Sequence, residues 1–293
     1  MTTIQPAYIP GLVKLVGKTL VNEEFSQITI AGDCLAKLAD HGLDQRIKVI
    51  IPRQQPPVST RLIEDPQNWY TNWRNLSEAE REPIRTYTIL NPSNQSCSLD
   101  LLIANHEPEG VVGHWLADAS IGDELVVVFP NRLSSDSGIG IDWQPGRATD
   151  YLILADVTAI PAVKGILAAI SEVGANGTTG TIVIESAAPI DALDLPKAGL
   201  DVVWLKTSSA DLPGTKLTAW VAQHLATTVL GFEVASEEEL VWDSPSAGDR
   251  DRYLWCAAEA GAVKTIRRLV KDSGAYSKND CAFMGYWKRG FAG

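Results

Sequence analysis

The stretch YLILADVTAIPAVKGIL, residues 151–167, decides the fold class of the second half of the chain. Its first part, Tyr151–Ala155, is a continuous apolar run that is typical of a strand buried on both faces of a sheet. The apolar residues of Ile160–Val173 then recur with helical spacing, so the sequence predicts a helix only a few residues after the strand. A buried strand that leads into a helix is the usual beginning of an α/β domain.

The same alternation continues toward the C-terminus. Further apolar runs predict buried strands at Thr181–Glu185, Val202–Leu205 and Arg252–Ala258. Amphipathic spacing predicts helices at Lys216–Val229 and Ala262–Lys271. Strands that alternate with helices imply a parallel sheet covered on both faces, so we predict an α/β domain over residues 149–293.

Toward the N-terminus the pattern changes to short strands separated by turn-forming residues. Six such strands are predicted, at Leu12–Val16, Gln27–Ala31, Ile47–Pro52, Thr86–Asn91, Cys97–Asn105 and Glu124–Pro130. Short helices are expected near Ser77–Glu82, where Ser77 and Glu80 have the spacing of a capping box, and at His114–Ala119. This arrangement predicts an antiparallel barrel or sandwich over residues 1–148, joined to the second domain through Ser134–Asp150.

Composition restricts the possible functions. The 293 residues carry 25 Lys and Arg against 36 Asp and Glu, a net charge of −11 that argues against nucleic acid as the main partner. No apolar run approaches the roughly 18–20 residues that span a bilayer, and the N-terminus lacks the zones of a signal peptide, so we expect a cytoplasmic protein without a membrane partner. The four cysteines and four histidines are dispersed, so we expect no metal site. Nothing in the sequence indicates an obligate assembly, and we expect a monomer.

The first motif that indicates chemistry is REPIRTYTILNP, residues 81–92. On a strand, alternation puts Arg85 and Tyr87 on one face and Thr88 on the other. A flavin needs a planar amphipathic neighbour for its ring and a cation for its pyrophosphate, and Tyr and Arg meet these needs. The alternative is an ordinary strand with a solvated arginine.

The second motif is Gly110–Gly113, which reads GVVG and precedes a predicted short helix. Small residues at that place let backbone N–H groups approach a phosphate at a helix N-terminus. The alternative is a plain loop between strands, and nearby His106 taken alone is more typical of a structural histidine.

Two further motifs lie in the α/β half. Asp156, Thr158 and Glu259 follow predicted buried strands, at the edge where open α/β sheets bind their ligands, but each could equally cap a helix. Between residues 264 and 289, seven basic residues are opposed only by Asp272 and Asp280, a local charge of +5. Such a cluster would attract an anion if its members share a face, whereas a solvated helix surface is the alternative. The seven are Lys264, Arg267, Arg268, Lys271, Lys278, Lys288 and Arg289.

Taken together and in this order, these segments resemble the siderophore-interacting protein family, the FAD-dependent ferric-siderophore reductases. The resemblance covers nearly the whole chain. It is carried by Leu12–Pro52, Arg85–Thr88, the His106…Gly110…Trp115 segment, Asp156–Pro161, Trp255–Glu259, the helix with Arg267 and Arg268, and Gly285–Gly290. It implies a six-stranded antiparallel FAD-binding barrel followed by a nicotinamide-binding α/β domain. Family members take electrons from NADPH or NADH, some from ferredoxin, and reduce siderophore-bound Fe(III).

The resemblance also implies roles for particular residues. The flavin would contact Arg85, Thr86, Tyr87 and Thr88, and its phosphates His106, Gly110, Val111, Val112, Gly113 and Trp115. The nicotinamide side would be faced by Asp156, Thr158, Ala159 and Glu259. A ferric siderophore would be bound by Lys264, Arg267, Trp287, Lys288 and Arg289. No acid–base residue is expected to be catalytic, because the flavin carries the electron chemistry.

This chain departs from the family pattern at four places. Leu90 stands where R-x-Y-T-x-R has its last arginine, and Gly110–Gly113 replaces the usual G-P-A-S. Val157 replaces the glutamate of D-E-T-A, and Ala258 replaces the glycine of A-G-E. Two alternatives therefore stay open: a flavin reductase with another acceptor, such as a quinone or free flavin, and a non-catalytic cytoplasmic siderophore-binding protein.

Overall fold

The computed structural model describes residues 5–105, 110–173, 177–189, 194–226, 241–245 and 248–290. The chain divides into two compact units, and the boundary lies between Ile141 and Asp142, inside the Ser-, Gly- and Asp-rich segment. The first unit is an antiparallel β structure and the second is an α/β structure, the fold class that the sequence predicts.

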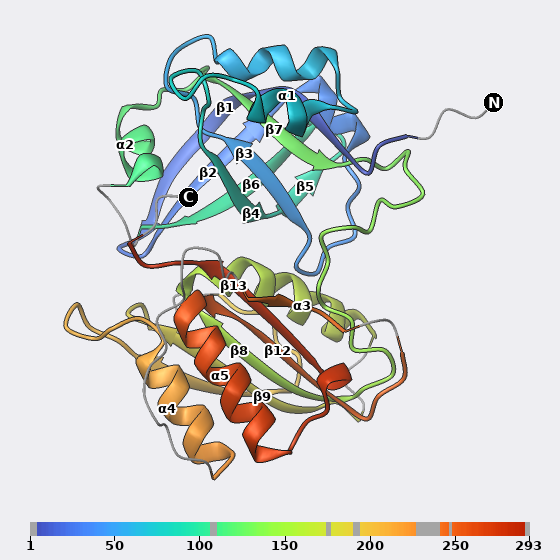
Figure 1. Cartoon of the computed structure of the whole chain (residues 1–293), viewed down its shortest axis with the longest axis vertical. Coiled ribbons are helices and arrows are strands. Elements are labelled where there is room, and N and C mark those ends of the chain that lie inside the picture. The colour runs from blue at the N-terminus through green and yellow to red at the C-terminus, as the bar shows by residue number, and fades with distance from the viewer. Residues whose placement is uncertain are drawn as a thin grey trace. The chain divides into compact units, whose positions relative to one another are not determined.

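The first unit contains one antiparallel sheet (Figure 1). Its strands are β1 (Tyr8–Asn22), β2 (Phe25–Ala31), β3 (Arg46–Ile50), β4 (Ile84–Thr88), β5 (Leu90–Ser93), β6 (Ser98–Ala104) and β7 (Glu124–Pro130). Their order across the sheet is β4-β3-β7-β1-β2-β6-β5. The sheet therefore has seven strands among the described residues, one more than predicted.

The additional strand arises because the predicted strand Thr86–Asn91 is interrupted at Ile89. The parts before and after Ile89 belong to β4 and β5, which lie at opposite edges of the sheet. Because one residue connects the two edges, the sheet must curl until they meet. Ile89 is 8 % exposed and its N–H donates to the carbonyl of Gln45, so burial and a backbone bond fix the corner.

The barrel strands bury alternate residues on their two faces. One face forms the interior cluster, which includes Leu15, Ile30, Ile47 and Phe129. The other face of β3 and β7 carries a smaller cluster, covered by Trp69 and Trp73 of α1 (Trp69–Arg74) and by the 3-10 helix η2 (Val58–Glu64). The remaining helical elements of this unit are η1 (Asp33–Lys37) and α2 (Val111–Asp118).

The prediction of a helix near Ser77–Glu82 is wrong. Ser77 and Glu80 do form the expected side-chain bond, at 2.8 Å, but the chain makes only a turn there. The physical reason lies at Glu82, whose carboxylate is fully buried and accepts bonds from the amides of Val58 and Ser59. These bonds hold the segment around Glu82 next to η2, and β4 begins just after that segment.

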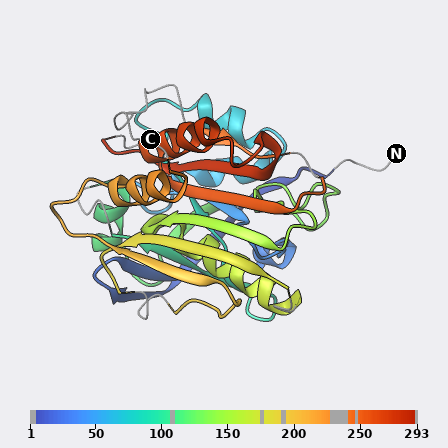
Figure 2. The ribbon, with the colours of Figure 1, turned by 90° about the horizontal axis from the view of Figure 1, so that it is seen from below.

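The second unit contains a six-stranded sheet in the order β10-β9-β8-β12-β13-β11 (Figure 2). The five strands β8 to β10, β12 and β13 run parallel, and β11 is antiparallel to β13. The strands are β8 (Asp150–Asp156), β9 (Thr179–Ser186), β10 (Asp201–Lys206), β11 (Trp242–Asp243), β12 (Arg252–Glu259) and β13 (Cys281–Trp287). The strand order reverses between β8 and β12, which is the switch point where doubly wound sheets bind ligands.

Helices cover both faces of this sheet. The helices α4 (Thr215–His224) and α5 (Ala260–Ser273) lie side by side on one face, where they pack against Leu154, Val183 and Cys256 (Figure 1). The helix α3 (Ile160–Val173), which has the predicted bounds, follows β8 through the short η3 (Val157–Ala159) and covers the other face. A last 3-10 helix, η5 (Lys278–Asp280), leads into β13.

Candidate functional site

In the barrel unit, the residues of the R-x-Y-T motif lie on β4 as predicted. Arg85 and Tyr87 stand opposite Val49 and Ile47 of β3, on the interior face of the sheet. Thr86 and Thr88 lie on the outer face, Thr86 exposed and Thr88 buried. Burial raises the pKa of the Tyr87 hydroxyl, so this group stays protonated and can donate a hydrogen bond. One guanidinium nitrogen of Arg85 donates to the carbonyl of Ile84 at 2.9 Å.

The helix predicted at His114–Ala119 begins earlier than expected: α2 has Gly110 as its N-cap, so Val111–Gly113 form its first turn instead of a loop before it. Among the described residues, no side chain accepts a hydrogen bond from the first-turn amides, and the first turn carries no acidic residue. A helix N-terminus carries partial positive charge and unpaired N–H groups, so this one is suited to an anion. His106 lies outside the described residues.

Residues of the β4 motif and of α2 both pack against the core of the barrel unit. Tyr87 packs against the interior cluster together with Val111, Val112 and Trp115 of α2. The barrel unit therefore carries a tyrosine ring, the neighbouring Arg85 and a helix N-terminus that no described side chain caps. These are the groups that a ring with an attached phosphate requires.

Lys48 of β3 was not anticipated from the sequence. It stands opposite Thr86 and Val128, on the outer face that also carries Thr88. Burial, with a smaller contribution from Arg46, lowers the pKa of its ammonium group. Within the described part of the chain it has no hydrogen-bond or ion-pair partner. The sequence feature that could have indicated it is the presence of a lysine within the alternating strand Arg46–Ile50.

In the α/β unit, Asp156 ends β8 at the switch point and is 4 % exposed. Its Oδ1 accepts bonds from the amide of Thr158 at 2.9 Å and from the Thr158 hydroxyl at 2.6 Å. Its Oδ2 accepts bonds from the amide of Glu259 at 2.8 Å and from Trp287 Nε1 at 2.7 Å. Both carboxylate oxygens are therefore occupied by donors of the chain itself.

Two more buried carboxylates lie along the same edge of the sheet. Glu259 ends β12, and its Oε2 accepts bonds from the amides of Gly261 and Ala262 at the start of α5. Glu185 of β9 accepts bonds from the amides of Gly214 and Leu217 at the start of α4. Asp156 and Glu259 therefore have the geometry of helix caps, which is one of the two alternatives that the sequence left open. Thr158 and Ala159 lie in η3 beside Asp156, and Ala159 is fully buried.

The predicted basic cluster is spread over both ends of the sheet. Lys264 lies near the start of α5, and Lys288 and Arg289 follow β13, all at the carboxyl edge. Lys271 and Lys278 lie at the opposite edge, near the end of α5 and the start of β13. Arg267 pairs with Asp243 at 2.9 Å, which neutralises its charge locally. The structure thus gathers only part of the +5 charge at one place.

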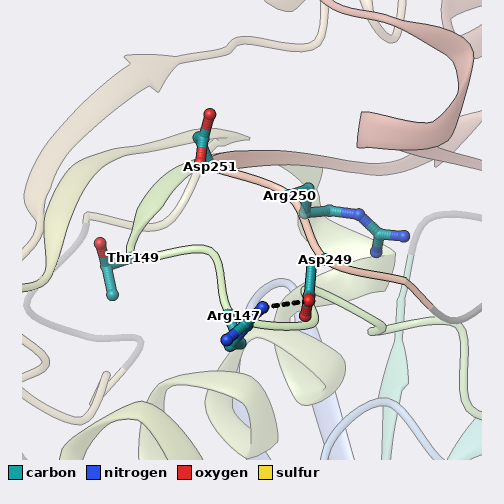
Figure 3. Close-up of a pocket in the computed structure, with 5 residues that line it drawn as sticks. All are labelled: Arg147, Thr149, Asp249, Arg250 and Asp251. Atoms are coloured by element: carbon teal, nitrogen blue, oxygen red, sulfur yellow. Dashed lines mark hydrogen bonds and ion pairs between the residues drawn. The ribbon is translucent and has the colours of Figure 1, made fainter.

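A surface depression of about 480 Å³ lies at the other end of the parallel strands (Figure 3). It is lined by Arg147, Thr149, Asp249, Arg250 and Asp251, and Arg147 pairs with Asp249. Thr149 and Asp251 directly precede β8 and β12, so a strand length of about 23 Å separates the depression from the switch point. Its two arginines and two aspartates balance in charge, which gives no preference for an anion.

Other classes of site find no support in the described part of the chain. No group of three or more His, Cys, Asp or Glu side chains there could hold a metal ion. All four cysteines are free. No helix among these residues is long and apolar enough to cross a membrane.

Comparison with known proteins identifies the family. The siderophore-interacting FAD-binding domain model matches residues 14–133, and the siderophore-interacting protein model matches residues 148–290. The chain belongs to the siderophore-interacting protein family. The matched segments cover the barrel unit and the α/β unit in turn, so the FAD-binding part of the family corresponds to the unit that contains Tyr87 and α2.

The curated relatives differ in how much of their own length this chain covers. The mycobactin import ATP-binding/permease protein IrtA of Mycolicibacterium smegmatis is 25 % identical over 80 % of this chain but only 24 % of its own length. The chain thus spans about a quarter of that relative. An uncharacterized protein of Mycobacterium tuberculosis is 30 % identical over 75 % of this chain and 70 % of its own. The ferric vibriobactin reductase ViuB of Vibrio cholerae is 25 % identical over 54 % and 53 %.

Solved structures give the fold. A siderophore utilization protein from T. fusca superposes with a TM-score of 0.67 at 24 % identity, covering 99 % of this chain and 97 % of that one. The siderophore-interacting protein SipS from Aeromonas hydrophila gives 0.65 at 21 %, covering 98 % and 94 %. The ferredoxin reductase of carbazole 1,9a-dioxygenase gives 0.57 at 14 %, covering 96 % and 71 %. The fold is therefore that of the ferredoxin-reductase group.

The barrel residues fit the FAD that the family model implies. The first-turn amides of α2 are uncapped by any described side chain, and Arg85 and Tyr87 share a face of β4 in the same unit. The departure from G-P-A-S to Gly110–Gly113 removes a hydroxyl but leaves these amides in place. Gly110 has φ −78°, so its backbone is one that any residue could adopt, and its value is its small size.

Proposed function

We propose that this protein is an FAD-dependent reductase that transfers electrons from NADPH or NADH to siderophore-bound Fe(III) and so releases Fe(II) in the cytoplasm. The observation that supports this proposal most is that both units match one siderophore-interacting family. The FAD-binding model matches the unit that contains α2, whose first turn no described side chain caps. The relation to ViuB, a ferric vibriobactin reductase, supports reductase chemistry. The four free cysteines are consistent with a reducing compartment.

The reaction balances when one reduced nicotinamide serves two ferric ions. It yields the oxidised nicotinamide, one proton and two ferrous ions. Bound FAD would supply the step between an electron pair and single electrons, which a protein side chain cannot carry out. Fe(II) binds a siderophore more weakly than Fe(III), so reduction releases the metal.

In this proposal, the chain's own residues would bind the FAD and the siderophore and orient them. Arg85 and the first-turn amides of α2 would hold the pyrophosphate, and the Tyr87 ring would support the flavin. Thr88, buried on the adjoining face, would donate or accept a hydrogen bond near the redox ring. Arg289, which is exposed just after β13, would attract an anionic siderophore.

An absorption spectrum tests the proposal. The purified protein, incubated with excess FAD and desalted, is expected to be yellow and to be bleached anaerobically by NADPH or NADH. Adding a ferric siderophore should restore the colour, while ferrozine traps two Fe(II) for each nicotinamide oxidised. A protein that retains no flavin would contradict the proposal, and bleaching without reoxidation by ferric siderophores would contradict its acceptor.

The contacts at the switch point favour a second candidate electron donor, a reduced ferredoxin. The carboxylates of Asp156 and Glu259 are occupied by the chain's own donors, and these were the residues expected to face a nicotinamide. A reduced ferredoxin would need no such pocket. Bleaching by ferredoxin and a ferredoxin reductase, but not by excess NADPH or NADH, would favour ferredoxin as the donor.

A further inference from the structure

The helix α2 is held to strand β1 at its C-terminal end by the side chain of Lys18. The Lys18 Nζ donates to the carbonyls of Leu116 and Ala119, both at 2.8 Å. The last carbonyls of a helix have no partner within the helix, and the helix dipole favours a cation near them. The last turn of α2 contains no basic residue of its own, so a lysine from a strand takes that place.

A bulge in β1 turns Lys18 toward α2. The pairing of β1 with β2 is regular up to Leu15 and resumes at Gly17, so Val16 is an additional residue. In a strand without this bulge, alternation from the interior residue Leu15 would put Lys18 on the outer face. With the bulge, Lys18 stands opposite Ile28, which belongs to the interior cluster against which α2 also packs.

The loop after α2 is tied to the same part of β1. The Gly122 amide donates to the Leu15 carbonyl at 2.8 Å, and the Leu15 amide donates to the Asp123 carbonyl at 2.9 Å. The Ser120 amide donates to Asp123 Oδ2 at 2.9 Å, which leaves the last-turn carbonyls of the helix to Lys18. The C-terminal end of α2 is therefore fixed to β1 on both sides of the bulge.

The helix α2 depends on such contacts for its order. It has eight residues, and none of them is buried. An isolated helix shorter than about 12–15 residues is marginal in water, so packing and end contacts must supply its stability. The first-turn amides lie at the opposite end of the helix, about 12 Å from the clamp, and no described side chain caps them.

We infer that Lys18 is a positioning residue that orders α2 and so presents its first-turn amides to the FAD pyrophosphate. The inference deepens the proposed function and rests on its assignment of the flavin phosphates to α2. Lys18 acts through the helix and not by contact, because it bonds to the opposite end of α2. Amides that are already held in place lose less entropy on binding than those of a fraying helix, so the clamp strengthens the binding of a phosphate-bearing flavin.

The test compares two lysines of the same strand. Lys18→Met keeps the apolar stem of the side chain but removes the charge and the donors, whereas Lys18→Arg keeps both and serves as the rescue. Lys14→Met is the matched control, because Lys14 is also exposed on β1 and its side chain has no hydrogen-bond or ion-pair partner among the described residues. The apoprotein of each variant is titrated with FAD and with riboflavin, which has the same ring but no phosphate, and its Tm is recorded.

Lys18→Met is expected to raise the Kd of FAD about tenfold, which corresponds to about 1.4 kcal/mol, and to leave the Kd of riboflavin unchanged. Lys14→Met should change neither, and Lys18→Arg should recover most of the lost affinity. The loss relative to wild type should persist at about 0.5 M salt, because salt screens a long-range charge effect but not the ordering of a helix. An equal loss for FAD and riboflavin, or a loss that disappears in salt, would overturn the inference.

The two probes separate the inference from the proposed function. If wild type binds FAD no more tightly than riboflavin, the phosphate site of the proposed function fails, and this inference fails with it. If wild type prefers FAD and Lys18→Met keeps that preference, the proposed function stands and the positioning role is overturned. Hydrogen exchange gives an independent readout on the amides of His114 and Ala119, which donate to carbonyls of α2 and its N-cap. They should exchange faster in Lys18→Met than in Lys14→Met, and equal rates would contradict the clamp.

Discussion

The two units treat the N-termini of their helices in opposite ways. In the barrel unit α2 begins at Gly110, and no described side chain caps its first turn. In the α/β unit, buried carboxylates at strand ends cap η3, α4 and α5: Asp156, Glu185 and Glu259 respectively. Anion-binding donors are thus retained in the first unit and consumed internally in the second. The comparison predicts that phosphate binding and fold stability depend on different residues.

The largest expected effect is on the stability of the α/β unit. Asp156→Asn should lower the free energy of unfolding by about 2–3 kcal/mol, because an amide NH₂ would face N–H donors and leave at least one buried donor unpaired. Urea unfolding measures the change. The control is Asp150→Asn at the exposed start of the same strand, where the change should stay within about 0.5 kcal/mol. Equal midpoints for the two variants would remove the structural role of Asp156.

The next effect is on flavin binding in the barrel unit. Arg85→Ala should weaken FAD binding by about 1.5–3 kcal/mol, roughly ten- to a hundredfold, through loss of a charge-assisted bond to the pyrophosphate. Arg61→Ala is the matched control, because Arg61 is exposed and, within the described residues, pairs only with Glu80 at the surface. Titration of the apoprotein with FAD gives both affinities. A loss of the same size in both variants would show a general effect of barrel charge.

Much of this fold could be predicted from local pattern. The helix Ile160–Val173 and the buried strand beside it follow directly from apolar spacing. The predictions that were wrong depended on contacts with residues far away in the chain. The predicted helix at Ser77 is only a turn, because Glu82 bonds to η2. The predicted strand Thr86–Asn91 is divided into β4 and β5, because the chain turns a corner of the barrel at Ile89. The strand β13 was not predicted, although Cys281–Trp287 is a nearly continuous apolar run, because basic residues flank it on both sides.

The candidate site could likewise be predicted only in part. Alternation on β4 correctly predicted that Arg85 and Tyr87 share a face. For Asp156, the sequence could place the side chain at a strand end but could not choose between capping and ligand binding. That choice depends on Glu259 and Trp287, which lie 103 and 131 residues away in the chain. No local pattern reports such contacts.

A smaller effect is expected from making α2 resemble the helices of the other unit. Gly110→Asp should supply the missing cap and stabilise the helix, yet weaken FAD binding about tenfold, because the carboxylate repels the pyrophosphate. Gly110→Asn is the matched control, since it caps a helix equally well without charge. A loss only in the aspartate variant would attribute the effect to charge, and equal losses would attribute it to capping. Unchanged FAD affinity in both variants would break the comparison between the units.

The smallest effect distinguishes two carboxylates near the start of α4. Burial raises the pKa of Glu185 above its usual 4.5, whereas bonds from Lys216 and Ser208 lower the pKa of Asp211 below its usual 3.8. Wild type should therefore lose stability relative to Glu185→Gln as the pH rises from 4.5 through the folded pKa, because ionising a buried acid opposes folding. Relative to Asp211→Asn, wild type should lose stability as the pH falls below 3.8. Urea midpoints measured across this range would give difference curves of opposite slope. Parallel curves would mean that Glu185 is not penalised by burial, and that its two backbone donors stabilise the ionised form as they would in an exposed cap.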